Sequence, residues 1–208
     1  MAVIDMRGGI ASDDDPQARI VAATLRCFAR WGMGKTTLDD VAREAGLSRA
    51  TVYRIVPGGK ENLLTLVSVS ELNRFFMELD SAVRSVNGLE NTLVAGVTTA
   101  ARHLDDHGAL QFMIEHEPQQ ILPRFAFTNL DRILANVRAF AAPYLEPWLG
   151  DQAGSTAEWL ARIVLSYACA PSDEFDLTDE ESARRLVRTY VMPGIRITDQ
   201  SSISTSTA

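Results

Sequence analysis

Between residues 16 and 61, apolar side chains recur at helical spacing and divide into three amphipathic stretches. The inner stripe of the first stretch consists of Ile20, Ala23, Cys27 and Phe28. Positions three or four residues apart share one face of an α-helix, so this stripe predicts a helix with one buried side. Asp15 is suited to cap that helix, Pro16 to occupy its first position, and Gly32 to end it.

The next two stretches predict a pair of short helices joined by a tight turn. Thr37 and Asp40 stand three residues apart, as a capping box requires. Gly46 supplies the positive φ that ends the first of the pair, and Ser48 caps the second, which reaches about Ile55. Two amphipathic helices separated by a glycine turn are typical of a helix-turn-helix. The alternative is an ordinary helical hairpin inside a bundle.

The outer faces of the second helix carry groups suited to nucleic acid. They are Arg49, Ala50, Thr51, Tyr53 and Arg54. Arginine and hydroxyl side chains hydrogen-bond to base edges and phosphates, which favours DNA binding over the plain hairpin.

The remaining sequence predicts further helices and no strands. A long helix is expected from Lys60 to beyond Leu79. Shorter helices are expected at 89–106, 109–117, 124–141, 155–170 and 178–191. The cluster of Pro143, Pro147 and Gly150 predicts a loop, because proline and glycine interrupt helices. Residues 1–14 and the Ser/Thr-rich tail 195–208 are expected to be disordered, and the fold class to be all-α.

Charge is distributed unevenly along the chain. The chain of 208 residues has a formal net charge of −7 and is 46% hydrophobic. Within 15–61, however, eight Lys/Arg outnumber five Asp/Glu, so this stretch is net basic while the rest is acidic. An acidic C-terminal part would repel phosphates and leave the basic N-terminal part as the contact surface.

The sequence shows no targeting signal and no cysteine pattern that points to another class of protein. No apolar stretch is long enough to cross a membrane and no signal sequence stands out, so a cytoplasmic protein is expected. Cys27 and Cys169 lie in apolar helical segments and are expected to be buried free thiols.

Residues 16–64 resemble the DNA-binding domain of TetR-family transcriptional regulators. The resemblance is carried by "RWGMGKTTLDDVAREAGLSRATVYR", which ends at Arg54, and by "GGKENLL", which begins at Gly58. The family usually has an aromatic residue where Val56 stands and one residue fewer before Lys60. This departure predicts a longer turn ahead of the fourth helix.

The resemblance implies a DNA-binding domain at 15–62 and a helical effector-binding and dimerisation domain at 63–194. The positions it assigns to DNA, together with the outer face of the recognition helix, are Thr37, Ser48, Arg49, Ala50, Thr51, Tyr53, Arg54 and Lys60. We expect Arg49 and Thr51 to read bases, and Thr37, Tyr53 and Lys60 mainly to contact phosphate. Tyr53 could instead be a packing residue at the helix junction.

For the C-terminal domain the resemblance implies a small-molecule pocket and a dimer seam formed by the last two long helices. Candidate pocket residues are Phe76, Leu104, Phe112, Met113, His116, Phe125, Phe127 and Leu130. Candidate dimer residues are Trp159, Ile163, Val164, Tyr167, Leu186, Val187 and Tyr190. An apolar lining predicts an apolar effector, although such stripes also occur as plain core.

Metal binding and catalysis find little support in the sequence. His103 and His107 are four residues apart, which would place them on one helix face, and His116 follows between two glutamates. The zinc-protease motif is absent, and these histidines are equally suited to helix ends. No nucleophile has partners at a recognisable spacing, so neither an enzyme nor a cofactor is expected.

These observations lead to a single hypothesis with three alternatives. The chain is expected to be a homodimeric repressor that binds palindromic double-stranded operator DNA and is released by a small apolar effector. The alternatives are a DNA-binding protein without an effector, a metal- or lipid-binding helical protein, and a helical protein-interaction module.

Overall fold

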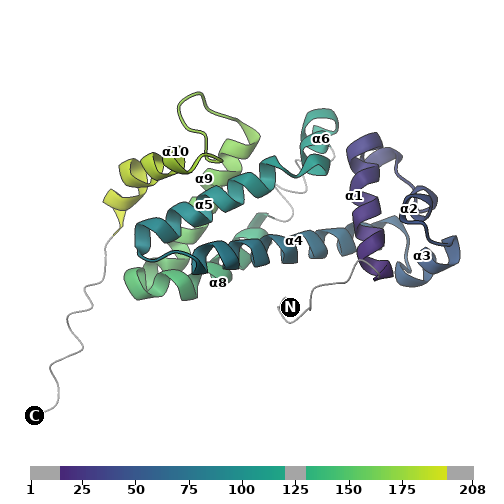
Figure 1. The fold of residues 1–208 in the computed structure, drawn as a ribbon, viewed down its shortest axis with the longest axis horizontal. Coiled ribbons are helices and arrows are strands. Elements are labelled where there is room, and N and C mark those ends of the chain that lie inside the picture. The colour runs from purple at the N-terminus through teal and green to yellow at the C-terminus, as the bar shows by residue number, and fades with distance from the viewer. Residues whose placement is uncertain (1–14, 120–129, 196–208) are drawn as a thin grey trace, which may run out of the picture. The chain divides into compact units, whose positions relative to one another are not determined.

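The computed structural model describes residues 15–119 and 130–195. The chain divides into two compact units (Figure 1). The first, which we call the head unit, comprises Met1–Met77 and His107–Pro123, and the second, the body unit, comprises Glu78–Asp106 and Arg124–Ala208. Every regular element within the described residues is helical, which confirms the all-α prediction.

The head unit contains α1 (Pro16–Lys35), α2 (Leu38–Ala45), α3 (Arg49–Ile55), α6 (Gly108–His116) and the first part of α4 (Lys60–Arg84). The predicted inner stripe of α1 is buried. It joins the apolar residues of α2, α3 and α4 in one core, which contains Ile20, Ala23, Cys27, Val41, Val52, Val56 and Leu63. The shared burial of these side chains holds α1, α2 and α3 against one another and against the start of α4.

The local signals in the head unit are confirmed except at Gly32, which kinks α1 and does not end it. The Asp15 carboxylate accepts a hydrogen bond from the Gln17 N–H, and Gly32 leaves helical geometry at φ 82° inside the span of α1. Thr37 and Asp40 form the capping box, and Gly46 ends α2 at φ 62°. The Ser48 hydroxyl caps α3 by accepting from the Thr51 N–H.

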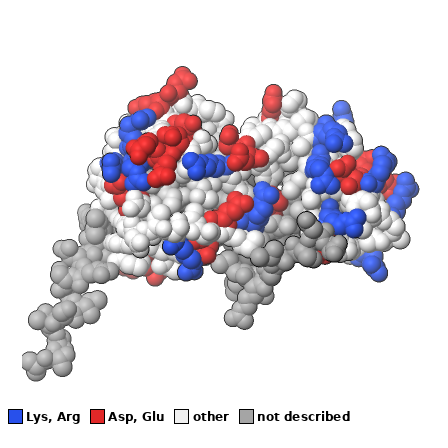
Figure 2. Space-filling view, viewed as in Figure 1, with Lys and Arg blue, Asp and Glu red and all other residues white. Residues whose placement is uncertain are grey.

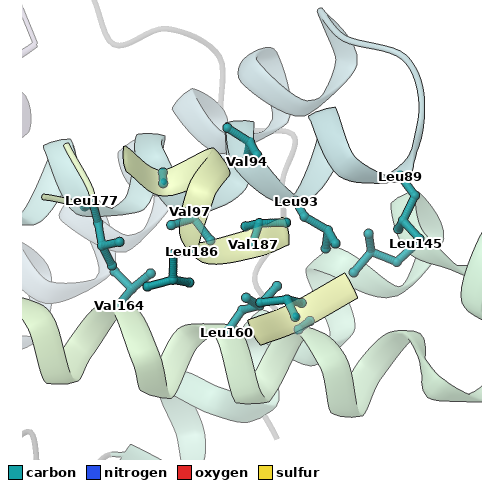
Figure 3. Packing of buried hydrophobic residues seen from close by; sticks show 14 of the residues in the cluster. Leu89, Leu93, Val94, Val97, Leu145, Leu160, Val164, Leu177, Leu186 and Val187 are labelled. Carbon is teal, nitrogen blue, oxygen red and sulfur yellow. The ribbon is translucent and has the colours of Figure 1, made fainter. Parts of the chain in front are cut away.

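The body unit contains α5 (Leu89–Asp105), α8 (Leu130–Leu149), η2 (Gly150–Gln152), α9 (Ala153–Cys169) and α10 (Glu180–Leu186), which continues as η3 (Val187–Val191) and η4 (Met192–Gly194). Figure 3 shows α5, α9 and α10 contributing leucine and valine side chains to one core. Val187 and Ala183 at its centre are fully buried, so α10 is held by apolar contact as well as by polar groups.

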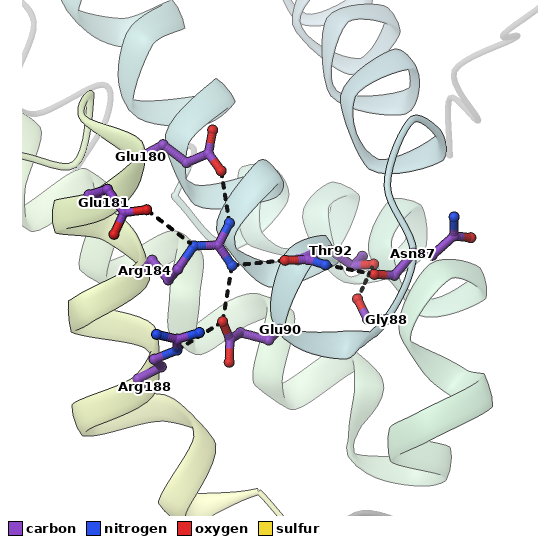
Figure 4. Close-up of polar contacts among 9 residues, drawn as sticks. Asn87, Gly88, Glu90, Thr92, Glu180, Glu181, Arg184 and Arg188 are labelled. Carbon is purple, nitrogen blue, oxygen red and sulfur yellow. Dashed lines mark hydrogen bonds and ion pairs between the residues drawn. The ribbon is translucent and has the colours of Figure 1, made fainter.

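A polar network ties α10 to the start of α5 (Figure 4). The Arg184 guanidinium donates to Glu90 at 3.0 Å, to Asn91 at 2.8 Å and to Glu180 at 2.8 Å. Arg188 donates to the same Glu90 oxygen at 3.0 Å. Hydrogen bonds from Arg188 and Arg184 hold the pKa of Glu90 below its ordinary value.

Two sequence predictions about the body unit are wrong. The helix α8 continues to Leu149 through Pro143 and Pro147, where a loop was expected. Both prolines are exposed and stand four residues apart, on one side of the helix. The backbone N–H hydrogen bonds that proline cannot donate are therefore missing on the exposed side. Cys169, expected to be buried, is exposed because it is the last residue of α9.

The division between units also differs from the boundary expected at 62/63. Helix α4 crosses that boundary without interruption, and α6 belongs to the head unit although it follows α5 by only a few residues. The segments expected to be disordered, 1–14 and most of 195–208, lie outside the described residues. None of the helices in the described part of the chain is long and apolar enough to span a membrane.

Candidate nucleic-acid interface

The seven residues of α3 present a buried side and an exposed side. Val52 is fully buried in the head core, and Ile55 packs against that core. Arg49, Ala50, Tyr53 and Arg54 are exposed, while Thr51 is partly exposed and its hydroxyl lies 2.8 Å from the Ser48 hydroxyl. Tyr53 is 53% exposed, so much of its side chain is open to contact with a partner.

The first turn of α2 lies beside the start of α3. The Arg49 guanidinium is 3.1 Å from the Asp39 carboxylate, and its side chain is still 71% exposed. Thr37, exposed at the α2 N-cap, donates through its N–H to Asp40 at 3.1 Å. Hydrogen bonds from Thr37 lower the pKa of Asp40, which keeps the capping carboxylate ionised. Asp39 is a partner of the recognition helix that sequence reasoning missed.

The start of α4 meets the residues that precede α2. Lys60 is the first residue of α4, and its ammonium donates to the Gly34 carbonyl at 3.0 Å. Residues 56–59 form a turn ahead of Lys60. Gly58 and Gly59 adopt positive φ in it, and Asn62 closes it by donating to the Pro57 carbonyl. Arg49 thus contacts the first turn of α2, and Lys60 contacts Gly34. Thr37 lies between these two contact points in the sequence.

Two long-range contacts that the sequence did not predict brace this arrangement. Arg19 of α1 donates to the Ala45 carbonyl at 2.6 Å and to the Gly46 carbonyl at 3.2 Å, which fastens α1 to the helix-turn-helix turn. The Glu117 carboxylate accepts from the N–H groups of Met33 and Gly34. Neither contact has a local sequence signal, because the partners are far apart in the chain.

Positive charge gathers over the head helices. Figure 2 shows Lys and Arg side chains concentrated over α1–α3. A shallow groove of about 320 Å³ is also found here, lined by Arg30, Trp31, Lys35, Asp40, Arg43 and Phe112. An exposed cationic surface beside a helix of hydrogen-bonding side chains can neutralise phosphates while base edges are contacted.

The residues expected to line an effector pocket are divided between the units. Phe76, Phe112, Met113 and His116 belong to the head unit, and Leu104 and Leu130 to the body unit. Phe76 and Met113 are buried, whereas His116 is exposed and stacks on Phe112 at 4.3 Å between ring centroids. Phe125 and Phe127 lie outside the described residues. The pocket stays a prediction.

The residues expected at a dimer seam fall into three groups. Val164, Leu186 and Val187 are buried in the core of the body unit, so they do not offer a surface to a second chain. Ile163 and Tyr167 are partly buried against that core. Trp159 on α9 and Tyr190 on η3 are 46% and 56% exposed.

The candidate metal-ligand histidines each have a separate partner. His103 Nδ1 lies 2.7 Å from Glu78, and His107 Nε2 lies 3.0 Å from Glu71. His107 also caps α6, because its Nδ1 accepts from the Leu110 N–H. In the part of the chain that the structure describes, no group of three or more His, Cys, Asp or Glu side chains is placed to hold a metal ion.

Comparison with known proteins agrees with this geometry. Residues 20–65 match the family described as "Bacterial regulatory proteins, tetR family". The uncharacterized HTH-type transcriptional regulator Rv1255c of Mycobacterium tuberculosis H37Rv is 27% identical over 179 residues, which are 84% of this chain and 83% of the relative.

Two solved structures have the same fold. The TetR family repressor AlkX from Dietzia sp., implicated in biodegradation of n-alkanes, matches with a TM-score of 0.62 at 20% identity, covering 88% of this chain and 98% of that one. The fatty acid degradation regulator FadR from Bacillus halodurans matches with a TM-score of 0.61 at 16% identity, with the same coverage. These relatives and neighbours are regulators and not enzymes, as expected from the sequence.

Proposed function

Because the chain belongs to the TetR family of transcriptional regulators, we propose that it is a dimeric repressor that binds palindromic operator DNA and is released by a small apolar effector. The observation that carries the proposal is the exposed side of α3, where Arg49 is held beside the first turn of α2. In this proposal α3 enters the major groove, and the chain acts in the cytoplasm, where operator DNA lies.

The roles of the contact residues follow from their chemistry. Arg49 and Thr51 can donate to base acceptors in the major groove, and a lost base contact costs about 1–3 kcal/mol. Thr37 and Lys60, at the starts of α2 and α4, are suited to phosphates on either side of that groove. Phosphate contacts set affinity and salt dependence, whereas the base contacts set sequence preference.

The first experiment measures binding to the DNA upstream of the protein's own coding sequence. Fluorescence anisotropy at low salt should give a complex with two chains on one duplex and a preference of at least about 10³-fold over a scrambled duplex. Equal binding to both duplexes would contradict operator recognition. Indifference to both duplexes would favour a protein-interaction module.

Dimerisation is proposed to use the exposed aromatic side chains of the body unit. One head covers a small footprint, so specific binding requires two heads on a repeated site. Trp159 and Tyr190 are aromatic side chains of the kind that anchor interfaces, and both are largely exposed in the single chain. A Trp159→Glu variant should elute as a monomer in light-scattering chromatography and lose operator affinity, while its circular-dichroism spectrum stays that of a folded helical protein.

For an effector to release the protein from DNA, it must bind the DNA-incompetent state more tightly than the competent one. An effector with equal affinity for both states would not shift the equilibrium between them. Helix α4 belongs to both units, so displacement of its Glu78–Arg84 end in the body unit can reach Lys60 in the head unit. Relatives in fold are connected by their descriptions with n-alkane and fatty acid degradation, which favours an acyl effector.

A saturated fatty acid, its coenzyme A thioester and an aromatic hydrocarbon can be tested in parallel. The active compound should raise the melting temperature of the free protein and release the duplex at matching concentrations. If no compound travels with the natively purified protein and none of the three alters melting or DNA binding, the effector-free alternative is favoured.

A further inference from the structure

The residue that follows α6 is held against the last four residues of α1, which turn toward α2 after the kink at Gly32. Glu117 Oε2 accepts from the Met33 N–H at 2.7 Å, and Oε1 accepts from the Gly34 N–H at 3.2 Å. Both distances fit charge-assisted hydrogen bonds, which are stronger than neutral ones. One carboxylate therefore fixes two successive peptide groups of the turn that leads into α2.

The turn is shaped to receive this carboxylate. Gly32 has φ 82°, a conformation that side-chain-bearing residues rarely adopt. A Cβ atom added at Gly32 would lie 2.6 Å from Glu117 Oε1, so the close approach also requires glycine. The Thr36 hydroxyl donates to the Gly32 carbonyl at 2.8 Å and completes the turn.

The same turn holds Lys60 from its other side. The Gly34 N–H is bound by Glu117, and the Gly34 carbonyl accepts from the Lys60 ammonium at 3.0 Å. An ammonium group has three N–H donors, so Lys60 keeps two for other partners while it is held in this way. Thr37, the cap of α2, follows three residues after Gly34.

We propose that Glu117 is a positioning residue for DNA binding: it fixes the Met33–Gly34 peptide group, and with it the adjoining Gly34 carbonyl that directs the Lys60 ammonium toward phosphate. This inference rests on the proposed function, since it concerns the same DNA contact. Any displacement of the C-terminal end of α6 would withdraw the carboxylate and leave Lys60 without a fixed orientation.

The sign of the effect separates positioning from simple electrostatics. Removal of a carboxylate near a DNA-binding surface should raise affinity if only charge matters. If Glu117 positions Lys60, its removal should lower affinity. Glu115→Ala is the matched control, because Glu115 carries the same charge two residues earlier on α6 and is largely exposed.

The test is a double-mutant cycle of Glu117→Ala and Lys60→Ala, with affinity for the operator duplex measured between about 50 and 200 mM salt. Lys60→Ala removes one phosphate contact from each chain of the dimer, so it should reduce the slope of log affinity against log salt by about 1.8. Glu117→Ala should weaken binding about fivefold or more in the wild-type background and less than about twofold in the Lys60→Ala background. Glu115→Ala should leave affinity unchanged or slightly raised.

Each other outcome counts against a specific statement. Equal losses from Glu117→Ala in both backgrounds, or a gain in affinity, would overturn the positioning role while DNA binding by the wild type stands. Failure of the wild type to select the operator would overturn both proposals.

A second measurement does not depend on the Glu117→Ala variant folding. Hydrogen exchange at the Met33 and Gly34 amides should be slow in the wild type. In Glu117→Gln, which keeps a single acceptor oxygen, at least one of the two amides should exchange about tenfold faster. Unchanged exchange at both amides would overturn the anchoring contact.

Discussion

Arg49 in the head unit is open to solvent, whereas Arg184 in the body unit is enclosed by its partners. Arg49 is 71% exposed and has Asp39 beside it. Arg184 is 16% exposed and donates to Glu90, Asn91 and Glu180. An exposed ion pair contributes about 0–1 kcal/mol, so Arg49 can exchange Asp39 for a DNA partner at little cost. Separation of Arg184 from its partners would cost more free energy, because its side chain is largely buried and makes several hydrogen bonds.

The difference shows how one residue type serves two purposes within one chain. Desolvation and the number of hydrogen-bond partners decide whether an arginine holds helices together or stays available to bind a ligand. Removal of Arg49 from the head unit should therefore change DNA binding and spare stability. Removal of Arg184 from the body unit should lower stability and spare the intrinsic affinity of the folded protein for DNA.

The largest expected effect is that of Arg49→Ala combined with Thr51→Ala. Each lost base contact should cost about 1–3 kcal/mol of operator binding, and preference over a scrambled duplex should disappear. The melting temperature should change little, because both side chains reach the surface. Anisotropy titrations with the two duplexes, together with thermal melts, measure both quantities.

Arg43→Ala is the control for charge, since Arg43 is exposed on α2 and pairs at 3.6 Å with Asp40. It should weaken binding to all duplexes alike, through the salt-dependent contribution of phosphates. If Arg49→Ala/Thr51→Ala protein still selects the wild-type operator, then α3 does not read the sequence through these residues.

The elements of the head could be predicted from sequence because their signals are local. Asp15, the Thr37–Asp40 pair, Gly46 and Ser48 each act within four residues, so spacing alone identifies them. The contacts of Glu117 with Met33 and Gly34 cross more than eighty residues. No periodicity records such a contact, and for that reason the anchoring role of Glu117 could be found only in the structure.

In the body, sequence patterns could not separate core from surface. Val164 and Leu186 were expected at a dimer seam, yet they are buried within a single chain. Helices with apolar residues on more than one side give the same pattern whether the second side faces a neighbouring helix or a second chain. Pro143 and Pro147 misled for a related reason, since a proline on the exposed side of a helix interrupts it little.

The next expected effect concerns the fastening arginines. Arg184→Ala should lower the free energy of unfolding by about 1–3 kcal/mol, because it leaves Glu90 and Asn91 without a shared donor. Arg188→Ala is a matched control: Arg188 lies at the same 3.0 Å from Glu90 but is 63% exposed, so its loss should cost below about 1 kcal/mol. Urea unfolding followed by circular dichroism measures both.

Equal losses for Arg184→Ala and Arg188→Ala would show that burial does not set the strength of this network. Neither variant should change sequence preference on DNA, once the folded fraction has been accounted for. A change in preference would contradict the separation of roles between the two units.

The smallest expected effect is a pH-dependent one at the contact between α4 and α8. Tyr144 of α8 donates to the Asp80 carboxylate of α4, and Arg84 donates to it at 2.8 Å and 2.9 Å. The hydrogen bond from Tyr144, followed by that from Arg84, holds the pKa of Asp80 below its ordinary value. Tyr144→Phe should therefore cost about 0.5–1.5 kcal/mol of stability near neutral pH.

The sign of the pH dependence follows from the direction of the shift. A carboxyl group whose pKa is lowered by folding stabilises the fold above its unfolded pKa of about 3.9, and that stability is lost as pH falls through the lower folded value. The difference between wild type and Tyr144→Phe should thus shrink on acidification below about pH 4. In an Asp80→Asn background the same substitution should show no such acid dependence, since no carboxylate is left to titrate. An acid-dependent difference that persists there would mean that Tyr144 stabilises α8 through another group.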